Sequence, residues 1–207
     1  MSVITRLFTA RVFCAPAGIK HCFDHYAIAC SFLILLLLAL PAHAAGTCTP
    51  EVGELVSVEG RIEVQRNEKP DWQTARLNET LCQGDTLRAS ERSRATVQLI
   101  NQAVLRVDQN TAIRLDNITP DVEERSLLSL VKGAFQSFSR KPRGFEVNTP
   151  YLNGSIEGTE FVFRVEDGES VLTVFEGTVL ASNDQGNASV TGGESVAAKA
   201  GQPPQAR

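Results

Sequence analysis

The chain has 207 residues and a formal net charge of −4, from 20 basic and 24 acidic side chains. This length fits one ordinary globular domain or two small ones, and the charge excludes the usual basic kind of nucleic-acid-binding protein. Without the first 44 residues, 17 basic and 23 acidic residues remain, a net charge of −6, and no histidine is left. The mature chain therefore lacks Ser-His-Asp and Cys-His catalytic groups and the commonest transition-metal ligand.

Residues 1–44 have the organisation of a secretory signal peptide. A region with three basic residues precedes the apolar run 27–40, and Pro41 ends that run. As a helix these residues would reach roughly 21 Å, short of the ~30 Å hydrocarbon core, which is typical of a signal peptide. The sequence Ala42-His43-Ala44 predicts cleavage after Ala44 and a periplasmic or secreted protein. The alternative is an uncleaved signal anchor, and only then would the membrane be a partner.

Two cysteines, Cys48 and Cys82, remain after the predicted cleavage. Exported cysteines face an oxidising compartment, so an even number predicts a disulfide. A bridge between them would close a 35-residue loop, and the loop-entropy model gives it roughly 3–4 kcal/mol of stabilisation. A two-cysteine metal site is the competing interpretation, but the mature chain offers no histidine to complete it.

Apolar and polar residues alternate with period two along most of the mature chain, the pattern of half-buried strands. Two short strands are predicted at 56–59 and 61–65, on either side of Gly60. Further strands are predicted around the Gly84-Asp85 turn and at 96–100, 104–107 and 113–115.

The second half of the chain continues the same rhythm. Residues 126–135 fit neither the helical nor the strand period cleanly, and Gly133 with its strand-rich surroundings favours a strand. The turn dipeptide Asp167-Gly168 predicts a hairpin that joins 158–165 to 171–175. From residue 197 the chain is rich in Ala, Gly, Pro and Gln, which predicts a flexible tail over 197–207.

These elements predict an all-β fold of stacked short strands, which form a sandwich, a jelly-roll-like domain or a short β-solenoid after the N-terminal signal helix. A short lead at 45–51 would precede a β domain at 52–196. Five glycines at strand ends are predicted to be structural turn residues, and none belongs to a phosphate-binding loop motif. They are Gly60, Gly84, Gly133, Gly158 and Gly177.

The order and spacing of eight short motifs resemble the periplasmic FecR domain family. They lie at residues 60–64 (GRIEV), 81–88 (LCQGDTLR), 93–95 (SRA), 104–111 (VLRVDQNT), 132–133 (KG), 147–150 (VNTP), 157–161 (EGTEF) and 175–179 (FEGTV). The resemblance implies a bacterial, exported, all-β module of stacked strands. The namesake of the family is a regulator that passes a siderophore signal from an outer-membrane receptor to a cytoplasmic sigma factor.

Five arginines are candidate partner-binding residues, because they gather in one third of an acidic chain. They are Arg88, Arg92, Arg94, Arg106 and Arg114. On stacked strands they would form a basic stripe for an acidic protein patch or an anionic envelope polymer. Alternatively, they are a solvated strand face whose charges oppose aggregation.

Carboxylates are the remaining candidates for chemistry. Glu157 and Glu160 would lie on opposite faces of one strand, unlike the facing pair of a glycosidase. Asp85, Asp108 and Asp167 lie in turns without a calcium-loop motif. We therefore predict no catalytic residue, no metal and no cofactor. The first functional hypothesis is a non-catalytic interaction module that binds an envelope protein or polymer and no nucleic acid. The alternative is the periplasmic sensor part of a membrane-anchored signalling regulator of the FecR type.

Overall fold

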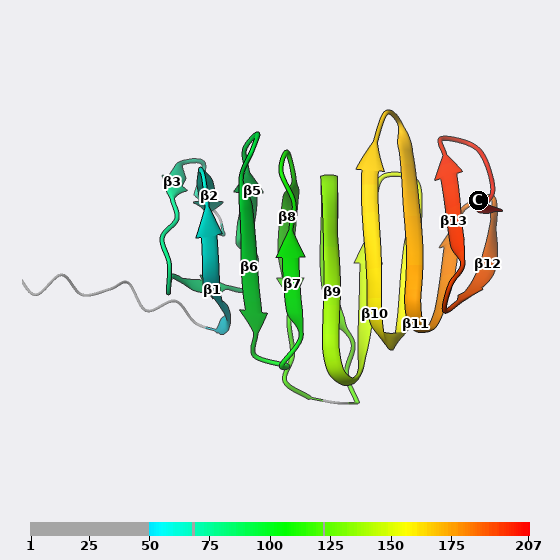
Figure 1. Ribbon diagram of the computed structural model, residues 1–207, viewed down its shortest axis with the longest axis horizontal. Helices are drawn as coiled ribbons and strands as arrows, with labels where there is room; N and C mark the ends of the chain where they lie inside the picture. Colours follow the sequence, from blue (N-terminus) through cyan, green and yellow to red (C-terminus); the bar gives the residue numbers. More distant parts are fainter. Residues whose placement is uncertain (1–49, 68, 122) are drawn as a thin grey trace, which may run out of the picture. The chain divides into compact units, whose positions relative to one another are not determined.

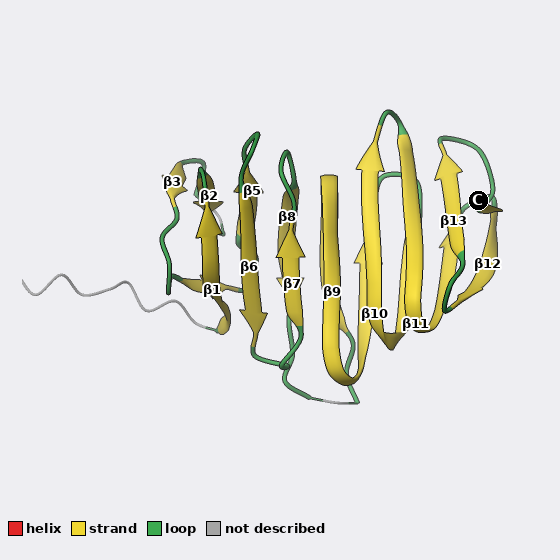
Figure 2. Ribbon diagram, viewed as in Figure 1, coloured by secondary structure: helices red, strands yellow, loops and turns green. Residues whose placement is uncertain are grey.

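The computed structural model describes residues 50–207 except 68 and 122, and it describes no side chain at 142, 143 or 159. The predicted signal helix, its cleavage site and Cys48 lie outside these residues. The described chain is built of strands, turns and loops, with no helix that could cross a membrane. The all-β prediction is thus confirmed (Figure 2).

Fourteen strands follow one another along the described chain (Figure 1). They are β1 (Glu51–Glu59), β2 (Ile62–Gln65), β3 (Trp72–Thr74), β4 (Thr80–Cys82), β5 (Thr86–Ala89), β6 (Arg94–Leu99), β7 (Val104–Val107), β8 (Ala112–Asn117), β9 (Ser126–Asn148), β10 (Asn153–Glu166), β11 (Glu169–Asn183), β12 (Gly186–Thr191), β13 (Ser195–Lys199) and β14 (Gln205–Ala206). The segment 126–135 lies in a strand, as predicted.

The strands pair in two layers that share three long strands. In the front layer the order is β4-β1-β6-β7-β9-β10-β11-β13-β14, with every pair antiparallel. In the back layer β3, β2, β5 and β8 pair in that order, and β8 pairs with the beginning of β9. The end of β9 and the beginning of β10 also pair in the back layer, where β11 pairs with β12. Figure 1 shows the two layers one behind the other.

The long strands β9, β10 and β11 each pass from one layer to the other. Strand β9 changes partner at Gly133: Lys132 pairs with Ala112 in β8, whereas Phe135 pairs with Val107 in β7. Strands β10 and β11 cross side by side, because Gly158 lies opposite Gly177 in the register. The sheet therefore wraps around its own core, as the predicted sandwich or short solenoid requires.

Four phenylalanines form the centre of the core between the layers. Phe135, Phe145, Phe161 and Phe163 are each at most 1% exposed, and their ring centroids lie 5.9–6.3 Å apart in four contacting pairs. Phe145 extends from the back layer to Phe161 of the front layer. Buried rings of this size supply much of the hydrophobic stabilisation of a small domain, so this cluster holds the layers together.

The glycine bends explain how one strand can serve two layers. Gly133 has a φ of 85° and Gly177 has a φ of 100°, a conformation that residues with a Cβ rarely adopt. A Cβ on Gly133 would collide with the Cα and Oγ1 atoms of Thr111. Of the other predicted turn glycines, Gly60 and Gly84 also have positive φ, and a Cβ on Gly158 would meet the carbonyl oxygen of Glu176 at 2.8 Å.

The predicted hairpin at Asp167-Gly168 is confirmed: Glu166 pairs with Glu169, and both turn residues have positive φ. The tail that the sequence predicts to be flexible differs in the structure. Residues 197–199 belong to β13, and β14 pairs with β13 at Val196 and Ala197. Backbone hydrogen bonds to a neighbouring strand outweigh the low strand propensity of this Gln- and Pro-rich segment.

Substitution of Gly133 tests the layer crossing. We expect Gly133→Ala to lower the free energy of unfolding by about 3 kcal/mol or more, because left-handed strain adds to a backbone collision. Gly168→Ala is the matched control: Gly168 also has positive φ but has no atom within 4 Å of an added Cβ. It should cost only about 1–2 kcal/mol. Equal losses in urea unfolding would show that the crossing at Gly133 is not crowded.

The predicted bridge between Cys48 and Cys82 gives a second test. Cys82 is buried at the end of β4, an edge strand that pairs only with β1 among the described strands. We expect Cys82→Ser to lower the melting temperature by several degrees, on the order of 2–4 kcal/mol. Cys48→Ser should have a similar effect, and a reducing agent should abolish the difference from wild type. An unchanged melting temperature, or two maleimide-reactive thiols in unfolded, non-reduced protein, contradicts the bridge.

Candidate functional site

A row of outward side chains crosses five strands of the front layer. The register places Ser57 of β1 opposite Thr96 of β6, Thr96 opposite Arg106 of β7, and Arg106 opposite Gln136 of β9. Gln136 in turn lies opposite Val162 of β10. Strand residues two apart share a face, so the alternation that buries Leu105 and Phe135 in the core turns this polar row outward.

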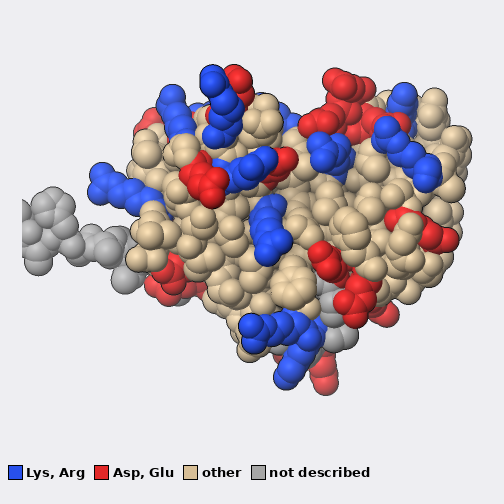
Figure 3. All heavy atoms as spheres, in the orientation of Figure 1, with Lys and Arg blue, Asp and Glu red and all other residues tan. Residues whose placement is uncertain are grey.

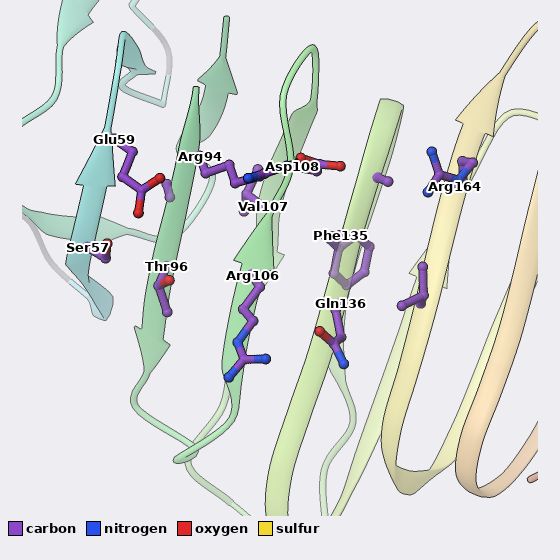
Figure 4. Close-up of a pocket in the computed structure, with 13 residues that line it drawn as sticks. Ser57, Glu59, Arg94, Thr96, Arg106, Val107, Asp108, Phe135, Gln136 and Arg164 are labelled. Atoms are coloured by element: carbon purple, nitrogen blue, oxygen red, sulfur yellow. Dashed lines mark hydrogen bonds and ion pairs between the residues drawn. The ribbon is translucent and has the colours of Figure 1, made fainter. Parts of the chain in front are cut away.

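The row lines a hollow of about 330 Å³, here called the Arg106 groove, which also includes Ala134 and Arg164. Short side chains at Ser57, Thr96 and Ala134 leave this space between longer neighbours. Figure 4 shows Arg106 and Gln136 at the lower end of the groove, with Arg94, Asp108 and Glu59 towards the upper end and Arg164 on the β10 side.

Two arginines at the upper end of the groove are paired with carboxylates. Arg94 Nε lies 3.0 Å from Asp108 Oδ1, and Arg164 Nη1 lies 3.3 Å from Glu166 Oε2. Partial burial raises the pKa of Asp108, but hydrogen bonds from the Gln109 backbone N–H and from Arg94 outweigh it, so that the pKa is lowered. Asp108 is therefore an ionised partner of Arg94 at neutral pH.

Arg106 differs from these arginines. It is exposed, and no carboxylate among the described residues lies within 4.0 Å of its guanidinium nitrogens. A guanidinium presents five N–H donors and stays charged at all physiological pH values. Arg106 is thus available to bind an anionic or carbonyl group that enters the groove.

A second hollow, here called the Phe138 groove, adjoins the first. It has a volume of about 500 Å³, and its lining includes Val104, Phe138, Arg140 and Lys141. Val104 lies opposite Phe138 in the register, one outward position from the Arg106–Gln136 pair. Phe138 is 39% exposed, and Phe175 of β11, at 52%, is another exposed aromatic ring.

The five arginines predicted to form one stripe are divided between the layers. Arg94 and Arg106 lie on the front layer, and both line the Arg106 groove. Arg88 on β5 and Arg114 on β8 belong to the back layer, where Arg114 pairs with Asp116 at 3.1 Å. Arg92 lies in the turn before β6 and contacts Glu91 at 3.6 Å. Of the five, only Arg106 has no ion-pair partner within the described part of the chain.

Arg88 belongs to a polar cluster on the back layer. Its Nε and Nη2 donate to Glu63 Oε2 at 2.9 and 2.7 Å, and Arg61 Nη2 donates to Oε1 at 2.8 Å. The Arg88 guanidinium also lies 4.0 Å from the Trp72 ring centroid, a cation–π contact. The hydrogen bond from Arg88 is the largest influence that lowers the pKa of Glu63, against an opposing effect of burial and with further help from Arg61.

The candidate carboxylates do not form an acid pair. Glu157 pairs with Arg125 at 2.6 Å in the back layer, whereas Glu160 lies opposite Phe138 in the front layer, beyond the bulge at Gly158. Asp85 is buried and accepts hydrogen bonds from Arg66, from the Cys82 N–H and from the Asn67 N–H, which secures the turn before β5. No cluster of three potential metal-ligating side chains occurs among the described residues.

Sequence reasoning missed several residues of the two grooves. Gln136, Phe138 and Arg140 lie on the front face because β9 continues in strand form beyond residue 135. The sequence does contain a signal for this continuation of the strand. Outward and inward residues alternate along it, with Ala134, Gln136 and Phe138 on one face and Phe135 and Ser137 on the other. The pairing of β9 with β7, which places these residues beside Arg106, carries no local signal.

Comparison with known proteins agrees with this fold. Residues 85–180 match the family model described as FecR protein. The resemblance to the FecR family is confirmed over this segment, which contains the whole of β7, β9 and β10 and therefore the centre of both grooves. No curated protein matches the chain.

The fold is also similar to that of solved structures, of which two are described here. Both are crystal structures of a protein described as "a putative anti-sigma factor" from Parabacteroides distasonis ATCC 8503, at 2.50 Å and 1.65 Å resolution. Each has a TM-score of 0.51, with 14% and 15% sequence identity. The match covers 59% of this chain and 58% of that chain, so it spans less than two thirds of either. At this identity the similarity establishes the shared fold.

The pKa of Glu63 generates a pH prediction. We expect Glu63→Gln to lower the free energy of unfolding by about 1–3 kcal/mol at pH 7, because two arginines lose an anionic partner. Folding lowers the pKa of Glu63 from its ordinary value of 4.5. The difference in free energy of unfolding between wild type and Glu63→Gln is therefore fully present above pH 4.5. It is lost as the pH falls through the lower pKa of the folded state.

Urea unfolding of both proteins between pH 3 and pH 8 measures this difference. Glu157→Gln is the control, because Glu157 is exposed and its ion pair with Arg125 should contribute less than about 1 kcal/mol. A difference between wild type and Glu63→Gln that is independent of pH would show that the Glu63 charge does not stabilise the fold.

Proposed function

We propose that this chain is the periplasmic part of a FecR-type signalling regulator and that it acts by binding another envelope protein. The FecR match over residues 85–180 supports the regulatory assignment. The similar fold of the described anti-sigma factor from Parabacteroides distasonis also supports it. The predicted signal segment supports a periplasmic location.

The observation that carries the binding role is the front face of the sheet. Most arginines of the described domain are paired with carboxylates, but Arg106 stands unpaired in a hollow on a rigid five-strand surface. Preformed polar groups on such a surface provide specificity without a large ordering cost. Strand edges at β3, β4, β12 and β14 offer further main-chain donors and acceptors for a partner.

The hydrogen bonds and positions of the candidate carboxylates favour binding over catalysis. Glu157, Glu160 and Asp85 each have a hydrogen-bonding partner, and the first two lie on different layers. A general acid–base pair needs two carboxylates directed at one substrate. The chain instead offers a recognition surface, as a sensor domain requires.

The full chain with a C-terminal tag, produced in its own bacterium, tests the proposal. Cells are treated with a cross-linker, the tagged protein is purified under denaturing conditions, and bound proteins are identified by mass spectrometry. We expect one reproducible envelope protein to be cross-linked, and we expect deletion of the gene to change the transcript levels of a small set of genes.

The two measurements separate the hypotheses. A cross-linked partner with unchanged transcripts would replace the regulator by an exported interaction module. The absence of both a partner and a transcript change would overturn the proposed function altogether.

A further inference from the structure

The Phe138 groove has apolar residues in its middle and the cations Arg140 and Lys141 at one end, and Arg106 of the adjoining Arg106 groove follows at the other end. Phe138 and Val104 lie side by side in its middle. Arg106 is two residues beyond Val104 on β7, and Arg140 is two residues beyond Phe138 on β9. Residues two apart on a strand share a face, so Arg106, the two apolar residues and Arg140 follow one another along the front face. Lys141 adds a further cation at the Arg140 end.

These cations have no carboxylate partners. Within residues 50–207, as far as they are described, no carboxylate oxygen lies within 4.0 Å of the charged nitrogens of Arg106, Arg140 or Lys141. Glu160 lies opposite Phe138, but its Oε1 accepts a hydrogen bond from the Gln136 amide at 2.5 Å. Figure 3 shows basic side chains in the middle of this face and at its lower margin, with uncharged residues between them.

The local charge is opposite to that of the whole domain. Residues 45–207 have 17 basic and 23 acidic side chains, a net charge of −6. A long anionic polymer that crossed the domain would meet this negative field, whereas a short acidic segment would lie against Arg106, Arg140 and Lys141, with Glu160 held by Gln136 beside Phe138. Arginine and lysine recognise carboxylates by charge-assisted hydrogen bonds, and an exposed phenylalanine offers apolar contact area.

We propose that the Phe138 groove binds a short, extended, acidic segment of a protein partner. One apolar side chain of that segment packs on Phe138 and Val104, while a carboxylate on each side pairs with Arg106 or with Arg140 and Lys141. Because a strand rises roughly 3.3 Å per residue, the four steps of β9 from Gln136 to Arg140 span roughly 13 Å. The matching peptide pattern is acidic, any, apolar, any, acidic. This inference rests on the proposed function, since it specifies the partner chemistry of that binding role.

A displayed library of random 12-residue peptides provides the test, with the purified full chain as the target. We expect the selected peptides to be enriched in Asp or Glu two residues before and two residues after an apolar residue. Synthetic copies should bind wild type in fluorescence anisotropy, and copies with Asn and Gln in place of Asp and Glu should bind at least about tenfold more weakly, as expected for charge-assisted hydrogen bonds.

Variants of the target locate the site. Arg106→Gln and the double variant Arg140→Gln, Lys141→Gln should each weaken binding of the acidic peptide about tenfold or more. Arg114→Gln should leave it unchanged, because Arg114 lies on the back layer and is paired with Asp116. Melting temperatures within about 2 °C of wild type, expected for exposed surface positions, would establish that each variant is folded.

Four results would overturn the inference. These are the absence of any selected peptide, peptides without acidic enrichment, equal binding by Arg106→Gln, and dimerisation of the chain that Phe138→Ser abolishes. Binding of alginate, an anionic polysaccharide, in place of the peptides would assign the groove to a polymer. If cross-linking still captures an envelope protein and Arg106→Gln does not weaken that capture, the proposed function stands and only the groove assignment fails.

Discussion

The structure depends on the constraint that three strands must each belong to two layers. Backbone without a Cβ allows the bend of β9 at Gly133 and the joint bend of β10 and β11 at the facing pair Gly158 and Gly177. Strand β9 returns to the back layer between Phe138 and Arg143. On either side of those bends the phenylalanine cluster fills the space between the layers. Bends and core act together, because the bends bring the rings into contact and the contact between the rings keeps the layers closed.

The same crossing creates the candidate site. After Gly133, β9 enters the front layer and pairs with β7, which places Gln136 and Phe138 beside Arg106 and Val104. The side chains on the inner side of this strand pair are core residues and cannot move freely. The outward ones therefore stand on a rigid base, and rigid presentation reduces the entropy cost of binding. In this way the core supports the exposed face that carries both grooves.

Charge pairing distinguishes the arginines of the domain from one another. In the back layer Arg61 and Arg88 are paired with Glu63, and in the front layer Arg94 and Arg164 are also paired with carboxylates. Arg106, Arg140 and Lys141 of the front layer have no carboxylate partner among the described residues. Clustering of arginines in the sequence predicted one basic stripe, and it could not distinguish arginines held in ion pairs from those without a partner. Arg88 and Arg106 both lie on short strands and within motifs that resemble the FecR family. Of the two, only Arg88 has a carboxylate of the described residues, that of Glu63, within 4.0 Å.

The sequence by itself determined the strand content, the Asp167-Gly168 hairpin and the FecR resemblance, because alternation, turn dipeptides and motif spacing are local features. It also showed that residues 45–207 contain no histidine, which excludes histidine-based chemistry from that part of the chain. Only the tertiary structure decided which arginines share a face, which carboxylates are taken up in ion pairs, and that β14 extends the sheet in place of a flexible tail. The physical reason is that pairing between strands far apart in the chain sets these neighbours, and no short stretch of sequence records it.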